Sequence, residues 1–396
     1  MNKIMNRRLD PERDQTAARI WKHRTPLSSL RKAIDRGSVT LGFLGGSITE
    51  ARPGHNWPEK IVSWLVERYP NVRFTVENAA IGATGSNLAI FRLERDILRH
   101  QCDIVFVEYA VNDYYGDQER RKRSREGVLR RLLVESEADV VLVYTYLQAM
   151  YAEMITGGVP DSIAELEQLG ELYLLSSVWM GLYAFNEVQR GRMNWEEWLP
   201  DGLHPTHRGS YSYAESVIAF LEEELEKAPG DIAVHEETAK STLITSRGGI
   251  VPDGALPEPL NKRHWEAAQI IPFCDVQFEG PWTIQRSANV VWIDRMLTTS
   301  AIGAKLRFRF RGRGAALGFE FGRLYADFRC SIDGAEPVEI KPERAEWCPL
   351  EGLYHVEVLA EELDEGEHVA ELEIVHGNGM RCEGTRCRIA FLASLP

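Results

Sequence analysis

The chain has 396 residues, more than the ~100–200 of a single domain, so we expect at least two domains. Hydrophobic residues make up 44% and charged residues 27%, which are globular proportions that exclude wholesale disorder and a collagen-like fibre. A formal net charge of -13 argues against nucleic acid or an anionic membrane surface as a partner. No apolar run approaches the ~20 residues of a membrane-spanning helix.

The N-terminal sequence and the cysteines bear on the compartment. Residues 1–14 are polar and charged and lack the apolar segment of a secretory signal. Six cysteines are too few for a disulfide scaffold in a chain of this length. Cys382 and Cys387 form a single Cys-x4-Cys pair, which is a weak signal for a metal or redox site. We therefore expect free thiols and a cytoplasmic protein.

The first ~230 residues alternate short apolar strands with helices, which is the pattern of an α/β domain. We expect a helical lead-in at 1–37, with its helix over 11–35, followed by the α/β domain at 38–230. Strands are predicted over 39–44, 72–76, 104–109 and 140–146, with a short one near 172–178. Helices are predicted over 58–69, 87–99, 118–135, 162–189 and 209–227. Because the strands are apolar on both faces, the sheet should be parallel and covered on both sides.

The pattern changes after residue 230, and Pro and Gly concentrate at 228–231 and 248–259. Short strands separated by turns then predict an all-β domain over 231–396, a sandwich or jelly roll. Its predicted strands are 305–310, 315–321, 326–332, 352–359, 368–375 and 388–393. Two roles stay open for this domain: a carbohydrate-binding module, or a structural domain that packs beside the site or forms an oligomer.

A small-residue segment, Gly45-Gly46-Ser47-Ile48-Thr49, directly follows the first predicted strand of the α/β domain. Ligands of open α/β sheets bind at the carboxyl ends of strands, so Ser47 is placed where a nucleophile would act. The segment alone is also consistent with a plain turn or a phosphate cradle, although the Lys of a Walker loop is missing.

Asp201 and His204 lie three residues apart at the end of the α/β domain, just before its last helix. A serine hydroxyl needs a base, and the base needs an acceptor that fixes its tautomer, so this pair could supply both. A surface His in a loop before a helix is the alternative. A metal site formed by His207 and Asp201 is a further alternative, but no other ligand lies at a suitable spacing nearby.

Candidate donors to an oxyanion follow the second and third strands. The segment 78–85 is rich in small residues, and Asn112 stands in Ala110-Val111-Asn112-Asp113. A backbone N–H and an Asn side-chain amide can both stabilise a developing oxyanion. An Asx turn or a helix cap is the simpler reading of each segment.

Taken in order, these pieces resemble the SGNH hydrolases, also called GDSL-like esterases and lipases, over roughly residues 38–226. The resemblance implies a flavodoxin-like three-layer α/β/α domain and a carboxylic ester hydrolase. By resemblance Ser47 would be the nucleophile, His204 the base and Asp201 its orienting partner. Asn112 and the backbone N–H of Ser47 would line the oxyanion hole. The GGSIT form looks like a bacterial carbohydrate-esterase branch, some members of which carry an extra β-sandwich.

The sequence departs from the family pattern at three places. Gly46 replaces the Asp of Gly-Asp-Ser, and Ala110 replaces the Gly of Gly-x-Asn-Asp. The oxyanion residue after the second strand falls at Ala83 by counting from Asn78, but at Gly82 by residue identity. The sequence does not decide between these two.

The function expected from the resemblance is removal of short acyl groups, first of all acetyl, from a carbohydrate or other small ester, without a metal or cofactor. An acyltransferase would use the same triad, a lipase or thioesterase is less favoured, and a glycan-binding protein with a non-catalytic scaffold is the alternative of another class. Partners would be a small-molecule or oligosaccharide ester, with no nucleic acid or membrane, and a homo-oligomer stays open. Aromatic residues near the expected site mouth are candidates for stacking on a sugar: Trp57, Tyr109, Tyr114, Trp195 and Trp198.

Overall fold

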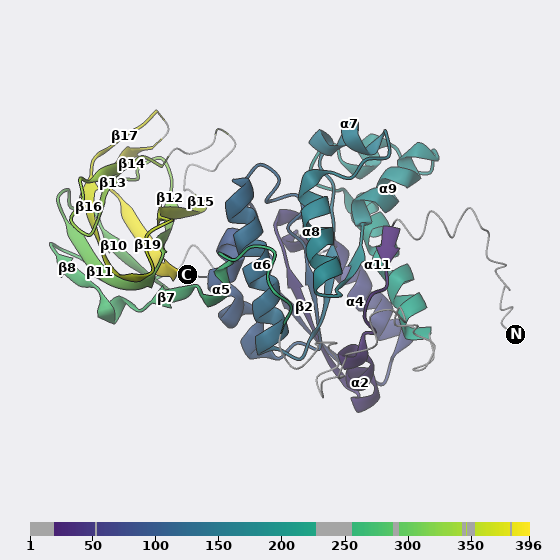
Figure 1. Cartoon of the computed structure of the whole chain (residues 1–396). Helices are drawn as coiled ribbons and strands as arrows, with labels where there is room; N and C mark the ends of the chain where they lie inside the picture. Colours follow the sequence, from purple (N-terminus) through teal and green to yellow (C-terminus); the bar gives the residue numbers. More distant parts are fainter. Residues whose placement is uncertain are drawn as a thin grey trace, which may run out of the picture. The chain divides into compact units, whose positions relative to one another are not determined.

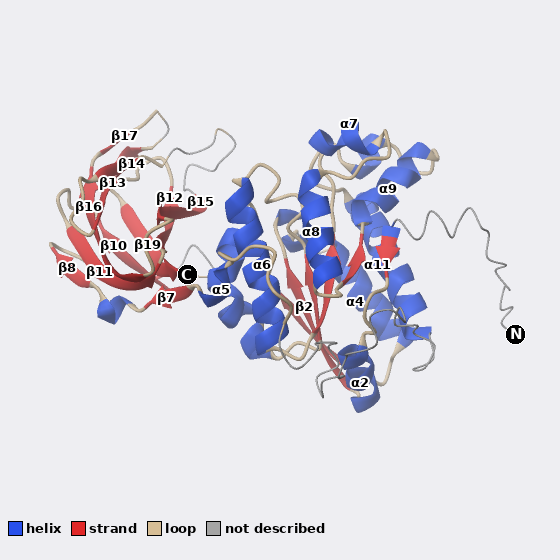
Figure 2. Ribbon diagram, viewed as in Figure 1, coloured by secondary structure: helices blue, strands red, loops and turns tan. Residues whose placement is uncertain are grey.

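The computed structural model describes residues 20–51, 54–226, 256–287, 293–342, 346, 353–380 and 382–396. The chain divides into two compact units, Met1–Lys262 and Arg263–Pro396. Helices and strands alternate in the first unit, whereas the second is built of strands with only short 3-10 turns among its described residues (Figure 2). No helix in the described part of the chain is long and apolar enough to cross a membrane.

The first unit is organised by a six-stranded sheet in the order β1-β6-β5-β4-β2-β3. Five strands run parallel, and read from β3 to β6 their order is 2-1-3-4-5, that of flavodoxin-like folds. All four residues of β4 are buried, which explains its uniformly apolar sequence. The strands are β1 Trp21–Lys22, β2 Ser38–Leu44, β3 Arg73–Asn78, β4 Ile104–Val107, β5 Asp139–Val143 and β6 Ser176–Val178.

Helices cover both faces of this sheet, with α5 and α6 on one side and α4 and α11 on the other (Figure 1). The α/β/α class predicted from the sequence is thereby confirmed. The main helices are α2 Ser28–Arg36, α4 Trp57–Arg68, α5 Ser86–Asp96, α6 Gln118–Glu135, α8 Asp161–Leu172, α9 Met180–Gln189 and α11 His207–Glu226. The short helices are α3 Ser47–Glu50, α7 Tyr151–Met154 and α10 Trp195–Trp198.

Two predicted helices differ from the structure. The helix expected over 11–35 begins only at Ser28, because residues 21–22 form β1 against β6 and the chain passes through Pro26 first. Residues before 20 lie outside the described part. The stretch 162–189, expected to be mostly helical, is two shorter helices, α8 and α9, and the short strand expected near 172–178 lies between them as β6.

The second unit is a sandwich of two antiparallel sheets, so its predicted class is also confirmed. One sheet has the order β15-β12-β19-β10-β9, with β7 on β19, and the other has β14-β13-β16-β11-β8. Buried side chains of both sheets, such as Phe308 and Leu372 from one and Leu317 and Ile389 from the other, share one core. The strands are β7 Gln269–Ile271, β8 Gln277–Glu279, β9 Thr283–Arg286, β10 Arg295–Thr299, β11 Lys305–Gly312, β12 Gly314–Phe321, β13 Asp327–Ile332, β14 Val338–Ile340, β15 Leu353–Ala360, β16 Gly366–Val375 and β19 Cys387–Leu395, with β17 Gly377–Asn378 and β18 Glu383–Gly384 as a separate ribbon.

The edge strand β1 is held to the first unit by the carboxylate of Glu167 on α8. This carboxylate lies 2.5 Å from Lys22 Nζ and 2.7 Å from Arg24 Nη2, and it accepts a hydrogen bond from the Tyr144 hydroxyl. Burial alone would raise the pKa of Glu167, but the hydrogen bonds and positive charges around it lower that pKa to about 2. Glu167 therefore stabilises the folded state in its ionised form.

We predict that Glu167→Gln lowers the free energy of unfolding at pH 7 by roughly 2–3 kcal/mol. Because the folded pKa is depressed, this stabilisation is complete above the unfolded pKa of about 4.3 and is lost as the pH falls towards 2. The difference between wild type and variant should therefore shrink in urea melts between pH 5 and pH 2.5. Glu171→Gln, at a carboxylate 65% exposed, is the control and should show no such pH dependence. A difference for Glu167→Gln that stays constant with pH would contradict this account.

Candidate active site

The candidate site lies where the order of parallel strands reverses, between the carboxyl ends of β2 and β4. Ser47 follows β2 and begins α3, and Asn112 follows β4. A crevice forms at this switch point because the connections from the two strands leave towards opposite faces of the sheet. The structure thus places Ser47 and Asn112 at the same edge of the sheet.

Ser47, His204 and Asp201 form a continuous hydrogen-bonded chain. Ser47 Oγ lies 2.9 Å from His204 Nε2, and His204 Nδ1 lies 2.8 Å from Asp201 Oδ2. With Asp201 accepting the Nδ1 proton, Nε2 is the nitrogen left to accept from the serine hydroxyl. The side chains of His204 and Asp201 are 48% and 54% exposed, so the chain of groups is open to solvent.

The Asp201 carboxylate also fixes the conformation of the loop that carries Asp201 and His204. Asp201 Oδ1 accepts hydrogen bonds from the backbone N–H groups of Leu203, at 2.9 Å, and His204, at 2.7 Å. Burial opposes ionisation of Asp201, but the hydrogen bonds from the His204 side chain and from these N–H groups lower its pKa. A further hydrogen bond, from Gln148 N to Gly202 O, fixes the loop to the chain after β5.

The segment 78–85 is tied to the segment that carries Ser47. Ile81 N donates to Gly45 O, and Asn78 Nδ2 donates to Thr49 O. Gly82 N donates to the Glu50 carboxylate at 2.7 Å, and the next residue, Ala83, has a φ of 58°. That left-handed conformation favours glycine, so Ala83 occupies the kind of backbone position that a family glycine would fill.

Asn112 packs directly on Gly46. A β-carbon on Gly46 would lie 1.9 Å from Asn112 Oδ1, so any side chain at this position would displace the Asn112 amide. The next residue, Asp113, anchors the segment, because its carboxylate accepts from Arg125 Nε and from the hydroxyl and N–H of Ser86. Glycine at position 46 thus allows the close approach of Asn112 in this chain.

Glu108 is a buried acid beneath the site that our sequence reasoning missed. Its side chain is fully buried and accepts hydrogen bonds from Thr145 Oγ1 at 2.7 Å and Thr49 Oγ1 at 3.2 Å, and the Gly46 N–H also contacts it. Burial raises the pKa of Glu108. The signal in the sequence was an acidic residue at the end of an otherwise apolar strand, Ile104 to Val107.

The structure removes three of the five aromatic candidates for sugar stacking. Trp57, Tyr109 and Trp198 are at most 1% exposed, so none of them offers a ring face to a substrate. Trp57 Nε1 instead donates to Thr49 Oγ1, inside the network of Glu108. They were expected at the mouth because they are near the motifs in sequence, but large aromatic side chains next to strand ends usually fill the core.

Tyr114 and Trp195 are only partly buried. Trp195 stacks on Trp198 with ring centroids 5.2 Å apart, and Tyr114 contacts the exposed Tyr115 edge to face. His207 is exposed and contacts the ring of His55. Within the described ranges, no group of three or more His, Cys, Asp and Glu side chains could hold a metal ion.

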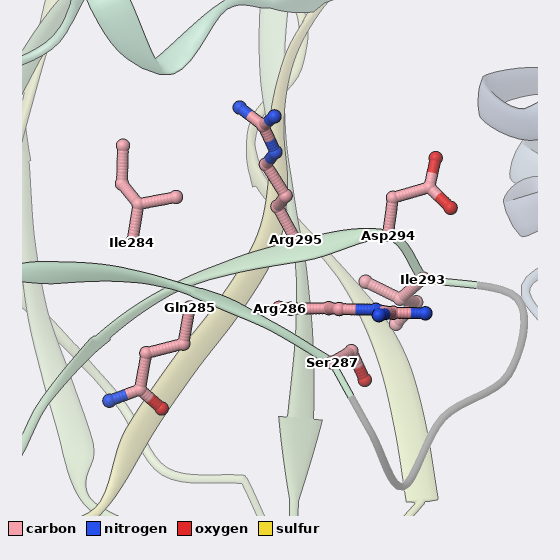
Figure 3. Close-up of a pocket in the computed structure, with 7 residues that line it drawn as sticks. All are labelled: Ile284, Gln285, Arg286, Ser287, Ile293, Asp294 and Arg295. Atoms are coloured by element: carbon pink, nitrogen blue, oxygen red, sulfur yellow. The ribbon is translucent and has the colours of Figure 1, made fainter.

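A separate pocket of about 640 Å³ lies in the second unit, between the ends of β9 and β10. Figure 3 shows Arg286 and Arg295 with Asp294 around it. Residues 288–292, which connect these strands, lie outside the described part of the chain. The pocket contains none of the groups predicted for catalysis.

Comparisons with known proteins bear on the family of the α/β unit and on the fold. Residues 43–210, from the end of β2 into α11, match the model of the GDSL-like Lipase/Acylhydrolase family. No curated protein sequence matches the chain. Two crystal structures of a two-domain esterase active on acetylated mannans, one co-crystallised with mannopentaose, cover 96% of this chain and 97–98% of that chain. They are 21% identical to it, with TM-scores of 0.76 and 0.77.

An acetyl xylan esterase from Geobacillus stearothermophilus covers 47% of this chain and 94% of its own, with 20% identity and a TM-score of 0.39. The family match confirms the resemblance that the motifs indicated and identifies the α/β unit as a GDSL-like acylhydrolase domain. Residues 43–210 thus match a family of carboxylic ester hydrolases. The two-domain esterase shares its α/β-plus-sandwich fold over nearly the whole chain.

We predict that Glu108→Gln lowers the free energy of unfolding of the first unit by roughly 1–3 kcal/mol. The amide keeps the size of the side chain but turns one of its acceptor oxygens into a donor, which leaves a buried hydroxyl or N–H without an acceptor. Urea unfolding followed by tryptophan fluorescence measures the change. Glu67→Gln, on the exposed face of α4, is the matched control and should be neutral. Equal stability of the two variants would contradict the proposed strength of this network.

Proposed function

We propose that the chain is a serine esterase that removes acetyl groups from a carbohydrate or another small neutral ester. The observation that carries the proposal is the hydrogen-bonded chain from Ser47 through His204 to Asp201 at the switch point of the sheet. Nucleophilic acyl transfer requires a hydroxyl, a base that accepts its proton and an acid that orients the base, and these three side chains make the necessary hydrogen bonds.

The reaction proceeds in two steps. Ser47 Oγ attacks the ester carbonyl carbon while its proton passes to His204 Nε2, and Asp201 stabilises the imidazolium that forms. The tetrahedral intermediate collapses, and the alcohol leaves with the proton from His204. Water then attacks the acetyl-enzyme with His204 again as base, which releases acetate and restores the Ser47 hydroxyl.

Three donors are proposed for the oxyanion: the N–H of Ser47, the amide of Asn112 and the N–H of Ala83. Two observations favour Ala83 over Gly82. The N–H of Gly82 is already bound to the Glu50 carboxylate, and Ala83 has the left-handed backbone expected where the family has glycine. A donor that is already bound to a carboxylate would have to break that bond before it could stabilise an oxyanion.

Hydrolysis is favoured over acyl transfer because the site is exposed to solvent. His204 and Asp201 are each about half exposed, so water reaches the acyl-enzyme freely. A transferase must exclude water while its acceptor binds. The two-domain esterase of like fold is active on acetylated mannans, which supports an acetylated carbohydrate as the substrate. Tyr114 and Trp195 remain candidates for contact with it.

For the β-sandwich we propose a structural role. Its aromatic side chains Trp265, Tyr325 and Tyr354 are at most 8% exposed and therefore belong to its core. Trp282 donates its indole N–H to backbone carbonyls of the same sheet region, Glu279 and Lys305. Side chains held in this way stabilise the sandwich rather than present free rings to a glycan.

For the compartment we propose the cytoplasm. Among the described residues, Cys102, Cys274, Cys330 and Cys387 are free thiols, and all of these but Cys274 are buried. Unpaired thiols are usual in a reducing compartment. The substrate would then be a soluble oligosaccharide or small ester, rather than an intact polysaccharide.

The role of Ser47 is tested by activity and by covalent labelling. We predict that Ser47→Ala lowers kcat/KM on p-nitrophenyl acetate by at least about 10³-fold and abolishes labelling by a fluorophosphonate probe, mapped by mass spectrometry. Wild type should prefer acetyl over octanoyl esters and should release acetate from acetylated oligosaccharides. Labelling that persists in Ser47→Ala would refute the nucleophile, and a preference for octanoyl would refute the acetyl substrate.

The contact between Gly46 and Asn112 gives a second test. We predict that Gly46→Ala lowers kcat by about 10²–10³-fold with a small change in KM, because its methyl group displaces the Asn112 amide from the developing oxyanion. Asn112→Ala should lower kcat to a similar extent, and the double variant should lose little more. Gly116→Ala, where a β-carbon meets only an ordinary contact, is the control. Unchanged kcat in Gly46→Ala would show that Asn112 is not an oxyanion donor.

A further inference from the structure

An acidic side chain stands beside the proposed nucleophile. Ser47 and Glu50 are the first and last residues of α3, and residues three apart lie on the same face of a helical turn. A β-carbon built on Gly82 would lie 3.6 Å from Ser47 Cβ and 2.7 Å from Glu50 Oε2. Ser47 and the Glu50 carboxylate therefore border the same small space, on the side of the segment 78–85.

The carboxylate of Glu50 is held in place but is not neutralised. It accepts the N–H of Gly82 at 2.7 Å, and Glu50 is exposed. Among the described residues, no Lys, Arg or His forms an ion pair with it. The Glu50 carboxylate is therefore held at the small space that Ser47 also borders.

Among the described residues, the other charges near the site do not cancel that of the Glu50 carboxylate. Asp201 adds a second carboxylate, which His204 balances only when the imidazole is protonated. The buried cations Arg92 and Arg125 are already paired, with Asp96 and Asp113 respectively. A substrate that enters the space beside Ser47 therefore meets a negative potential.

We propose that Glu50 is a specificity residue that sets the charge of the substrate, admitting neutral esters and disfavouring anionic ones such as uronates and dicarboxylate half-esters. The inference rests on the proposed esterase function and deepens it. A negative charge so close to a developing oxyanion also costs some rate on neutral esters, which the bond to Gly82 offsets by holding the segment 78–85 in place. Glutamine keeps an acceptor for the Gly82 N–H and removes only the charge.

The experiment compares two acetyl esters of matched shape, 4-acetoxybenzamide and 4-acetoxybenzoate, on wild type and Glu50→Gln. The first is neutral, and the second carries one negative charge at pH 7. We expect Glu50→Gln to raise the ratio of kcat/KM for the anionic over the neutral ester by about three- to tenfold. The wild-type preference for the neutral ester should weaken as salt rises from 0.1 M to 1 M, because the Debye length falls from about 10 Å to about 3 Å.

Glu67→Gln is the control, since it removes the same unit of charge from the exposed face of α4 and should leave the ratio unchanged. An equal loss on both esters in Glu50→Gln would show that Glu50 only holds the segment 78–85, and an unchanged ratio would overturn the inference. Labelling of Ser47 by a neutral fluorophosphonate separates the two hypotheses. If wild type is labelled and cleaves the neutral ester while the ratio does not move, only the role of Glu50 fails. If wild type reacts with neither, the esterase proposal fails and the role of Glu50 fails with it.

Discussion

The site depends on how closely the chain after β2 approaches the chain after β4. Gly45 and Gly46 have no side chains, so the turn into Ser47 can lie against the backbone of Glu108 and the amide of Asn112. A β-carbon on Gly45 would lie 3.1 Å from the Glu108 carbonyl oxygen, and one on Gly46 would overlap Asn112. Since the proposed nucleophile Ser47 and the proposed oxyanion donor Asn112 follow different strands, this close approach decides whether they can act on the same carbonyl group.

Beneath this contact, buried polar groups fix the three strand ends relative to one another. Glu108 joins the ends of β2, β4 and β5 through Gly46, Thr49 and Thr145. Asp113 and Arg125 then hold the segment with Asn112 to α5 and α6. Networks of this kind restrict a segment more tightly than apolar packing does, because every member loses a partner if one of them moves. The hydrogen-bonded chain of Ser47, His204 and Asp201, which is open to solvent, can therefore keep its geometry without being enclosed.

Much of the fold could be predicted from the sequence, because many elements are marked by short-range patterns of residues. The strand at 104–107 is apolar on both faces, and the helix over 118–135 has its boundaries fixed by Asp117 as N-cap and by the strand that follows. The strands over 269–286 were missed because their residues are mostly exposed and show no alternation of polar and apolar side chains. The strand at 21–22 is too short to leave a pattern and exists only through its partner β6.

Some residues of the candidate site could be predicted from local sequence and others could not. Ser47, Asp201 and His204 could be named because each lies in a short motif whose chemistry needs those residue types. Glu50 and Glu108 could not, because an isolated Glu carries no motif and its meaning depends on the backbone N–H groups that it contacts. The same limit explains Gly82 and Ala83, since the sequence lists both as small residues. Only the bond to Glu50 and the positive φ of Ala83 distinguish them. The Glu50 carboxylate thus supports both proposals: it binds the N–H of Gly82, which leaves Ala83 as the proposed oxyanion donor, and it borders the space that a substrate would enter.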